Sequence, residues 1–126
     1  MACSRLDENM SIIMPRGDIR EVLFNVYVDE DGEEVIYTDD FDEIYFTVKE
    51  FFEDEEYLFQ KRLTSGTITK DETSTYHIPI EPEDTNDLEF GEYMFDIELV
   101  TGNSIKQTTT GRLILTYEST YASNEV

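Results

Sequence analysis

The stretch GEYMFDIEL, residues 91–99, decides the fold class of this chain. Its apolar side chains occupy the odd positions from Tyr93 to Leu99, and acidic residues hold two of the three even positions between them. A period of two predicts an extended strand that buries one face and exposes the other. The turn residues Thr101-Gly102-Asn103 follow, so we expect this strand to form a hairpin with the next one.

The same period of two recurs along the chain and is interrupted by turn signals. The alternating runs cover residues 19–28, 44–48, 76–80 and 105–117, with Leu113 and Leu115 pointing inward in the last. Together with shorter extended segments, they give seven to nine strands and no convincing amphipathic helix. This pattern predicts an all-β fold, an immunoglobulin-like antiparallel β-sandwich.

Single residues refine this expectation. Asp31-Gly32 between two strand-like runs is a strong hairpin signal. Because Pro79 has no backbone N–H, its strand should lie at an edge, bulge there, or point that position away from its neighbour. Gly111 predicts a bulge or a close approach in the last strand. Residues 51–56 have no clear period and fit either a bulged connection or one helical turn.

The spacing Leu88-x-x-Gly91-x-Tyr93 follows a crossover at residues 82–88 that has turn or 3₁₀ character. It predicts a tyrosine corner, in which the phenol hydrogen-bonds to upstream backbone. A plain core tyrosine is the alternative interpretation. Gly91 and Tyr93 are therefore the structural candidates of this chain.

One domain fits the length of 126 residues. We expect the sandwich to span residues 12–118, with a flexible segment at 1–11 and a polar tail at 119–126. Cys3 is the only cysteine, so no intrachain disulfide is expected. No segment approaches the roughly 20 apolar residues of a membrane span, and the N-terminal residues lack the apolar run of a secretory signal. Synthesis in a reducing cytosol is the expectation.

The charge of the chain restricts its partners. Thirty acidic residues stand against nine lysines and arginines, which gives a net charge of −21. Such a charge repels nucleic acid and anionic lipid, so neither is an expected partner. Basic protein surfaces or cations are favoured instead.

Catalysis is not expected, and neither is a cofactor. His77 is the only histidine, and the alternation of residues 76–80 places it on the solvent face of its strand. No G-x-S-x-G or similar motif supplies a nucleophile for this imidazole, and Cys3 lies in a polar terminal segment. No carboxylate pair is distinguished as that of a glycosidase. The sequence therefore predicts that the chain is not an enzyme.

Clustered acids leave a calcium site as an alternative. The candidate ligands in the strand connections are Asp29, Asp31, Asp39, Asp40 and Asp42. Calcium prefers such oxygen ligands, but the first cluster lacks the D-x-[DN]-x-[DN]-G loop pattern. Solvated charge that discourages association between sheet edges is the simpler interpretation.

Two features lie near the start of the predicted sandwich. Arg16-Gly17-Asp18 matches a tripeptide of integrin ligands, although Gly-Asp before a strand is first a turn. Ile12, Ile13 and Met14 predict either a first edge strand or a surface for a neighbouring subunit, and we regard them as a possible interface.

Several landmarks together resemble a known family. They are RGD at 16–18, IYFTVK at 44–49, LFQKRL at 58–63, PEDTNDLEFGEYMFDIEL at 82–99 and T-x-x-G-R-L-I-L-T-Y-E at 108–118. The chain resembles the small immunoglobulin-like domains of tailed bacteriophages and Firmicute prophages, and is similar to the N-terminal domain of phage baseplate upper proteins. The stretch P-E-D-T-x-x-L-x-x-G-x-Y carries most of this likeness. Baseplate upper proteins continue into helical and trimeric parts, whereas this sequence ends at Val126.

The resemblance implies a non-enzymatic virion protein of the tail, baseplate, neck or head, made in the bacterial cytoplasm. Such an accessory subunit would contact other virion proteins with basic surfaces, and it could form a homo-oligomer. The main alternative is a recognition module whose end loops bind a glycan, a protein or Ca²⁺. A third is an inhibitor that mimics nucleic acid by its charge.

Overall fold

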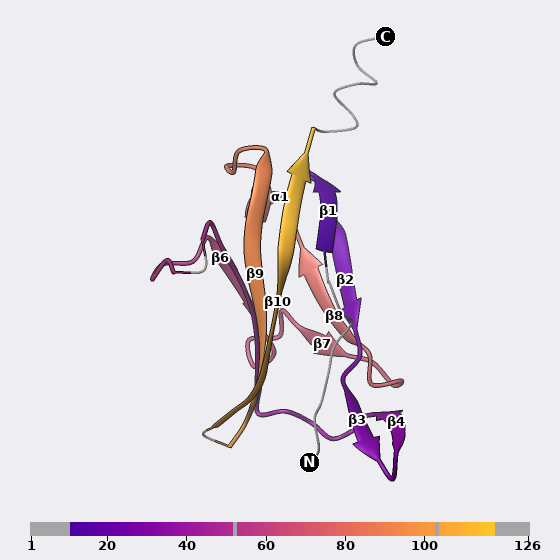
Figure 1. Cartoon of the computed structure of the whole chain (residues 1–126). Coiled ribbons are helices and arrows are strands. Elements are labelled where there is room, and N and C mark those ends of the chain that lie inside the picture. Colours follow the sequence, from indigo (N-terminus) through magenta and orange to yellow (C-terminus); the bar gives the residue numbers. More distant parts are fainter. Residues whose placement is uncertain (1–10, 52, 103, 118–126) are drawn as a thin grey trace.

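The computed structural model describes residues 11–51, 53–102 and 104–117. These residues form two β-sheets that pack face to face, a separate β-hairpin and one short helix (Figure 1). The larger sheet has five strands in the order β1-β10-β9-β5-β6. Their bounds are β1 (Ser11–Pro15), β10 (Ser104–Thr116), β9 (Gly91–Thr101), β5 (Glu43–Lys49) and β6 (Phe59–Arg62).

The smaller sheet has three strands in the order β2-β8-β7, and β3 pairs with β4 in the hairpin. Their bounds are β2 (Arg20–Phe24), β8 (Tyr76–Ile80), β7 (Thr69–Lys70), β3 (Tyr27–Glu30) and β4 (Glu33–Ile36). The fold is an all-β sandwich of immunoglobulin-like type, as the alternating pattern predicted. The described residues contain ten strands instead of seven to nine, because the run at residues 19–28 is divided between β2 and β3.

Strands β9 and β5 supply the centre of the core. On β9 the inward residues are those that the alternation predicted, from Tyr93 to Leu99, and all are buried. On β5 the same is true of Ile44, Phe46 and Val48. The rings of Phe46 and Phe95 lie 5.2 Å apart between centroids. Burial of one such side chain contributes about 1.5–3 kcal/mol, and this contribution fixes the register of the two strands.

The predicted long strand at residues 19–28 breaks at Asn25. The Asn25 side chain donates hydrogen bonds to Thr75 Oγ1, at 2.9 Å, and to the carbonyl of Ser74. After this break the chain leaves β8 and pairs with β4. Phe24, Val26 and Val28 are all buried as expected, so the prediction of the buried face is confirmed although the strand is not continuous.

The β3–β4 hairpin confirms the Asp31-Gly32 signal. Asp31 and Gly32 have φ angles of 53° and 83°, as a type I′ turn requires, and Glu30 pairs with Glu33 across it. Pro79 also satisfies its constraint. β8 is the middle strand of its sheet, but β7 pairs only with Tyr76 and His77, so β2 alone pairs with β8 at Pro79.

The last strand differs from expectation in one respect. Gly111 pairs with Phe95 in regular register, and the irregularity of β10 lies between Ile105 and Gln107. The bulge prediction at Gly111 was therefore wrong: the break in pairing is close to the β9–β10 turn and not in the middle of the strand. β10 also pairs in parallel with β1, which departs from a wholly antiparallel sandwich.

The crossover between β8 and β9 contains the helix α1 (Pro82–Thr85), a single turn with a hydrogen bond from Asn86 N–H to the Pro82 carbonyl. Proline at the first position and acidic residues in the first turn favour a helix start. The Glu81 N–H donates to the Asp84 carboxylate at 2.8 Å. The crossover thus begins with a single α-turn, where 3₁₀ character was the alternative, and continues as the predicted turn, with Leu88 N–H donating to the Thr85 carbonyl. Of the described residues, no helix is long and apolar enough to cross a membrane.

Candidate functional site

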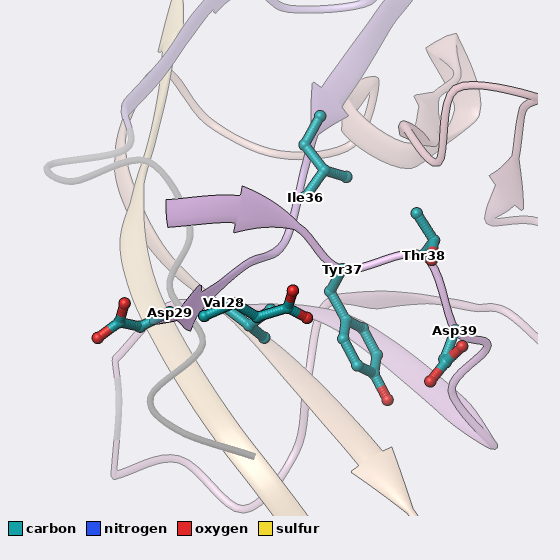
Figure 2. A pocket seen from close by; sticks show the side chains of 7 residues that line it. Val28, Asp29, Ile36, Tyr37, Thr38 and Asp39 are labelled. Atoms are coloured by element: carbon teal, nitrogen blue, oxygen red, sulfur yellow. The ribbon is translucent and has the colours of Figure 1, made fainter. Parts of the chain in front are cut away.

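The five aspartates proposed as calcium ligands lie near the β3–β4 hairpin but do not form one site. Asp29 and Asp39 line a shallow hollow of about 350 Å³ with Tyr37. Figure 2 shows their carboxylates at opposite ends of the group, with Tyr37 between them. Asp31 lies in the hairpin turn. Across the described residues, no group of three or more potential ligands could hold a metal ion.

Asp40 and Asp42 have partners within the protein. Lys70 Nζ lies 2.8 Å from Asp40 and also donates to the Thr38 carbonyl at 2.7 Å. Asp42 accepts a hydrogen bond from the Gly102 N–H. These contacts tie the strand connections together, which is a structural role for both carboxylates.

His77 lies on the outer face of β8, as predicted. Its ring nitrogens contact Glu21 at 2.9 Å and Asp71 at 2.7 Å. Hydrogen bonds to Asp71 and Glu21 raise the pKa of His77, and the bond to His77 contributes most to holding the pKa of Asp71 well below its usual range. With both ring nitrogens within hydrogen-bond distance of carboxylates, the His77 side chain joins β2 to the β7–β8 turn.

The larger sheet holds one buried carboxylate, Glu43, and one partly buried carboxylate, Asp96. Glu43 accepts hydrogen bonds from Arg62 at 3.1 Å and from Thr64 N–H at 3.0 Å; burial opposes its charge, but these bonds lower its pKa. Asp96 has the opposite balance. Burial and then the charge of Glu98 raise the pKa of Asp96, and its Oδ1 is buried with no hydrogen-bond partner among the described residues.

Gly91 and Tyr93 both have structural roles. The Tyr93 hydroxyl donates a hydrogen bond to the Glu89 carbonyl at 2.7 Å, which is the upstream backbone contact of a tyrosine corner. Gly91 has a φ of 140°, a conformation that residues with a side chain rarely adopt. Together they direct the chain from the crossover into β9.

The predicted interface of Ile12, Ile13 and Met14 requires a correction. These residues do form an edge strand, β1, but Ile12 and Met14 are 3% and 1% exposed and belong to the core. Parallel pairing with β10 turns them toward the opposite sheet. Of the three, only Ile13 is exposed, so the prediction that all three form an interface was wrong.

The Arg16-Gly17-Asp18 segment forms the turn between β1 and β2. Gly17 has a φ of 83°, and its N–H donates to the buried Thr85 Oγ1 at 2.8 Å. The Arg16 guanidinium donates to the Leu88 carbonyl at 3.3 Å and lies 4.4 Å from the centre of the Phe90 ring. The motif is therefore attached to the crossover by two of its three residues.

The most distinctive surface is one that the sequence reasoning missed. A groove of about 390 Å³ lies between the β5–β6 connection and the segment from the crossover to the start of β9. We call it the crossover groove. Its apolar lining is Phe51, Leu58, Leu88, Phe90 and Tyr93, and its acidic lining is Glu50, Asp87, Glu89 and Glu92. The only advance signal was the mixture of aromatic and acidic residues without a period near residue 51.

Figure 1 shows the β5–β6 connection projecting beside β6, and the β3–β4 hairpin at the other end of the sandwich from α1. The predicted segments 1–11 and 119–126 lie outside the described residues, apart from Ser11, which begins β1. Cys3 also lies outside them.

Comparison with known proteins supports the fold and no more. No family model matches the chain, and no curated protein does. Among solved structures, an endo-β-1,4-mannanase from Thermotoga petrophila is similar, with a TM-score of 0.57 and 11% sequence identity. The similarity covers 91% of this chain and 20% of that one. At this identity the likeness shows a shared fold alone.

Proposed function

We propose that this chain is a non-enzymatic structural component of a bacteriophage or prophage virion, acting through contacts with other virion proteins. The supporting observation is that residues of the stretch P-E-D-T-x-x-L-x-x-G-x-Y make structural contacts in the sandwich. The resemblance to phage domains rests mainly on this stretch. Thr85 binds the β1–β2 turn, Leu88 packs against the core, and Tyr93 forms the corner. The stretch serves to hold a sandwich together.

The remaining features agree with a protein that acts through its surface. His77 and Glu43 are engaged in contacts within the protein, which leaves them no evident catalytic role. A net charge of −21 favours a basic partner, and it would accelerate the association of this chain with that partner at low ionic strength. The expected station is the tail, baseplate, neck or head of the particle, after synthesis in the bacterial cytoplasm.

Detection of the chain in purified particles tests this proposal. Particles released by prophage induction from the strain that carries the gene would be banded on a density gradient and probed with an antibody against the purified chain. We expect the chain to band with the particles and to remain bound after a salt wash. Its recovery only from the soluble lysate would contradict a virion role.

A recognition module is the second candidate function, and the crossover groove is the observation that favours it. Aromatic side chains exposed between loops are a common platform for sugars and peptides. Light scattering with and without millimolar Ca²⁺ separates the candidates in part. An oligomer that does not respond to Ca²⁺ fits a structural subunit, and a monomer that binds Ca²⁺ fits the recognition module.

A further inference from the structure

We infer that the crossover groove is a docking site for an extended, basic segment of another protein, in which arginine or lysine side chains alternate with apolar ones. This inference rests on the proposed function and deepens it by naming the surface and the chemistry of the partner. It draws on the exposed rings, on the charge around them and on a contact within the chain itself.

The first observation is exposed apolar surface. Phe51, Leu58 and Phe90 are 55%, 40% and 39% exposed, and all three line the groove. Tyr57, beside Leu58, is 53% exposed. Large apolar side chains gathered in one place cost free energy in water, and such patches mark sites of association. A partner with apolar side chains would cover them.

The second observation is charge. Glu50, Asp87 and Glu89 line the groove, and none of its described lining residues is basic. Glu92 is paired with Arg112 at 3.3 Å outside the groove. A wholly apolar partner would remove the water that hydrogen-bonds to these carboxylates and would offer no hydrogen bonds in its place, which is unfavourable. Basic side chains between the apolar ones would supply that replacement.

The acidic side chains also act on the hydroxyl of Tyr93, which lines the groove. Burial raises the pKa of the Tyr93 hydroxyl, and the negative charges of Glu89 and Glu50 act in the same direction, whereas the hydrogen bond to the Glu89 carbonyl and the charge of Arg16 oppose the rise. The acidic side chains that line the groove therefore favour cationic side chains in a partner.

The third observation is that the protein already binds a cation at this rim. The Arg16 guanidinium lies 4.4 Å from the Phe90 ring centre and donates to the Leu88 carbonyl. An aromatic face together with a backbone carbonyl is thus a binding site for arginine in this chain. Phe51, on the opposite wall, offers a second aromatic face to a partner.

The hollow beside the β3–β4 hairpin lacks this combination. It also contains carboxylates, but of its large apolar side chains Ile36 alone is among the clearly exposed ones, and Tyr37 packs against the core. Its acids therefore provide a control with similar charge and little exposed apolar surface.

A peptide titration tests the inference. The labelled probe, called the apolar peptide below, is a short synthetic peptide in which arginine alternates with leucine and phenylalanine. The comparison peptide keeps the arginines and has serine at each apolar position. Fluorescence anisotropy gives the affinity of the full chain for each. We expect the apolar peptide to bind at least about tenfold more tightly, since burying one large apolar side chain contributes roughly that factor or more.

Matched variants locate the site. Phe51→Ser should weaken binding of the apolar peptide about tenfold, while Leu23→Ser, at an exposed position on β2, should leave it unchanged. The double variant Glu50→Gln with Asp87→Asn should weaken binding several-fold more than Glu30→Gln with Asp29→Asn, two acids that line the hollow beside the hairpin. Both doubles remove the same charge, so the difference reports on position. Thermal unfolding of each variant checks that it folds.

Several results would overturn the inference. Equal binding of both peptides, or equal effects of the two double variants, would show attraction by net charge alone. No binding of the apolar peptide would remove the site. Amide NMR shifts confined to the groove on addition of β-1,4-linked manno-oligosaccharides, with none from the peptide, would assign the groove to a glycan instead.

The particle test and the peptide test can give different outcomes, so the two proposals can be distinguished. Chain that bands with particles but does not bind the peptide retains the virion role and loses this docking site. Chain that binds the peptide through the groove but is absent from particles retains the site, and the partner then lies outside the virion.

Discussion

The ammonium of Lys61 lies 2.6 Å from the carboxylate of Asp84, and both side chains are nearly nine-tenths buried. The pair joins β6, the edge of the larger sheet, to the helical turn of the crossover. Asp84 also accepts the Glu81 N–H, so one carboxylate fixes both the start of α1 and its position over β6.

Replacement of Lys61 tests that connection. Lys61→Met keeps most of the aliphatic stem and removes the charge, which leaves a largely buried carboxylate without its cation. We expect a loss of about 1–3 kcal/mol in the free energy of unfolding, measured by urea denaturation. Lys70→Met is the matched control, because Asp40 is 87% exposed, and it should cost no more than about 1 kcal/mol. Equal losses would show that the Lys61 pair has no special role.

The tyrosine corner gives a second prediction. Tyr93→Phe removes the hydroxyl that donates to the Glu89 carbonyl and keeps the ring in the core. The expected loss of stability is about 0.5–1.5 kcal/mol. Tyr57→Phe, at an exposed position, should change stability by less than about 0.5 kcal/mol. If Tyr93→Phe changes stability as little as Tyr57→Phe does, the Tyr93 hydroxyl does not stabilise the fold and only its ring contributes.

His77 makes stability depend on pH. Because its pKa is raised in the folded protein, its contribution is complete below the unfolded value of 6.5 and disappears as pH rises through the folded value. Falling pH also relieves repulsion among the other acids, so the wild type must be compared with His77→Gln. We expect the stability difference between the two proteins to shrink from pH 5.5 to pH 9. A constant difference would show that Glu21 and Asp71 do not favour the imidazolium.

Asp96 is predicted to be a destabilising residue. It stands in register between Thr47 on β5 and Thr110 on β10, and its Oδ1 is buried with no hydrogen-bond partner in the described part of the chain. Asp96→Thr would complete a row of threonines, and we expect a gain of about 1 kcal/mol near neutral pH. The raised pKa sets the sign of the pH dependence: the gain should shrink as the pH falls and Asp96 takes up a proton. Urea denaturation at pH 7 and pH 4 measures both, and a loss at pH 7 would contradict the prediction.

The core was readable from sequence because burial on a strand repeats every second residue. Residues from Tyr93 to Leu99 and from Ile44 to Val48 need no knowledge of their partners to be placed inward. The Asp31-Gly32 turn was equally local, since its positive φ angles favour those two residues.

Features that depend on distant contacts were not readable. The break at Asn25 depends on Thr75 in the β7–β8 turn, and the burial of Ile12 and Met14 depends on β10. The crossover groove is built from the β5–β6 connection and the start of β9, and neither segment alone identifies a surface. The net charge of −21 could be counted from the sequence, but a net charge does not say where on the surface a basic partner would bind.

The parallel pairing of β1 with β10 also has a consequence for synthesis on the ribosome. Ser11 pairs with Arg112, and among the described strands β1 pairs with β10 alone, so β1 has no strand partner until β10 has left the ribosomal exit tunnel. Until then Ile12 and Met14 lack their cover and are exposed to chaperones. We therefore expect the sandwich to close only after β10 has been synthesised and released from the tunnel, with insertion of β1 among the slowest steps.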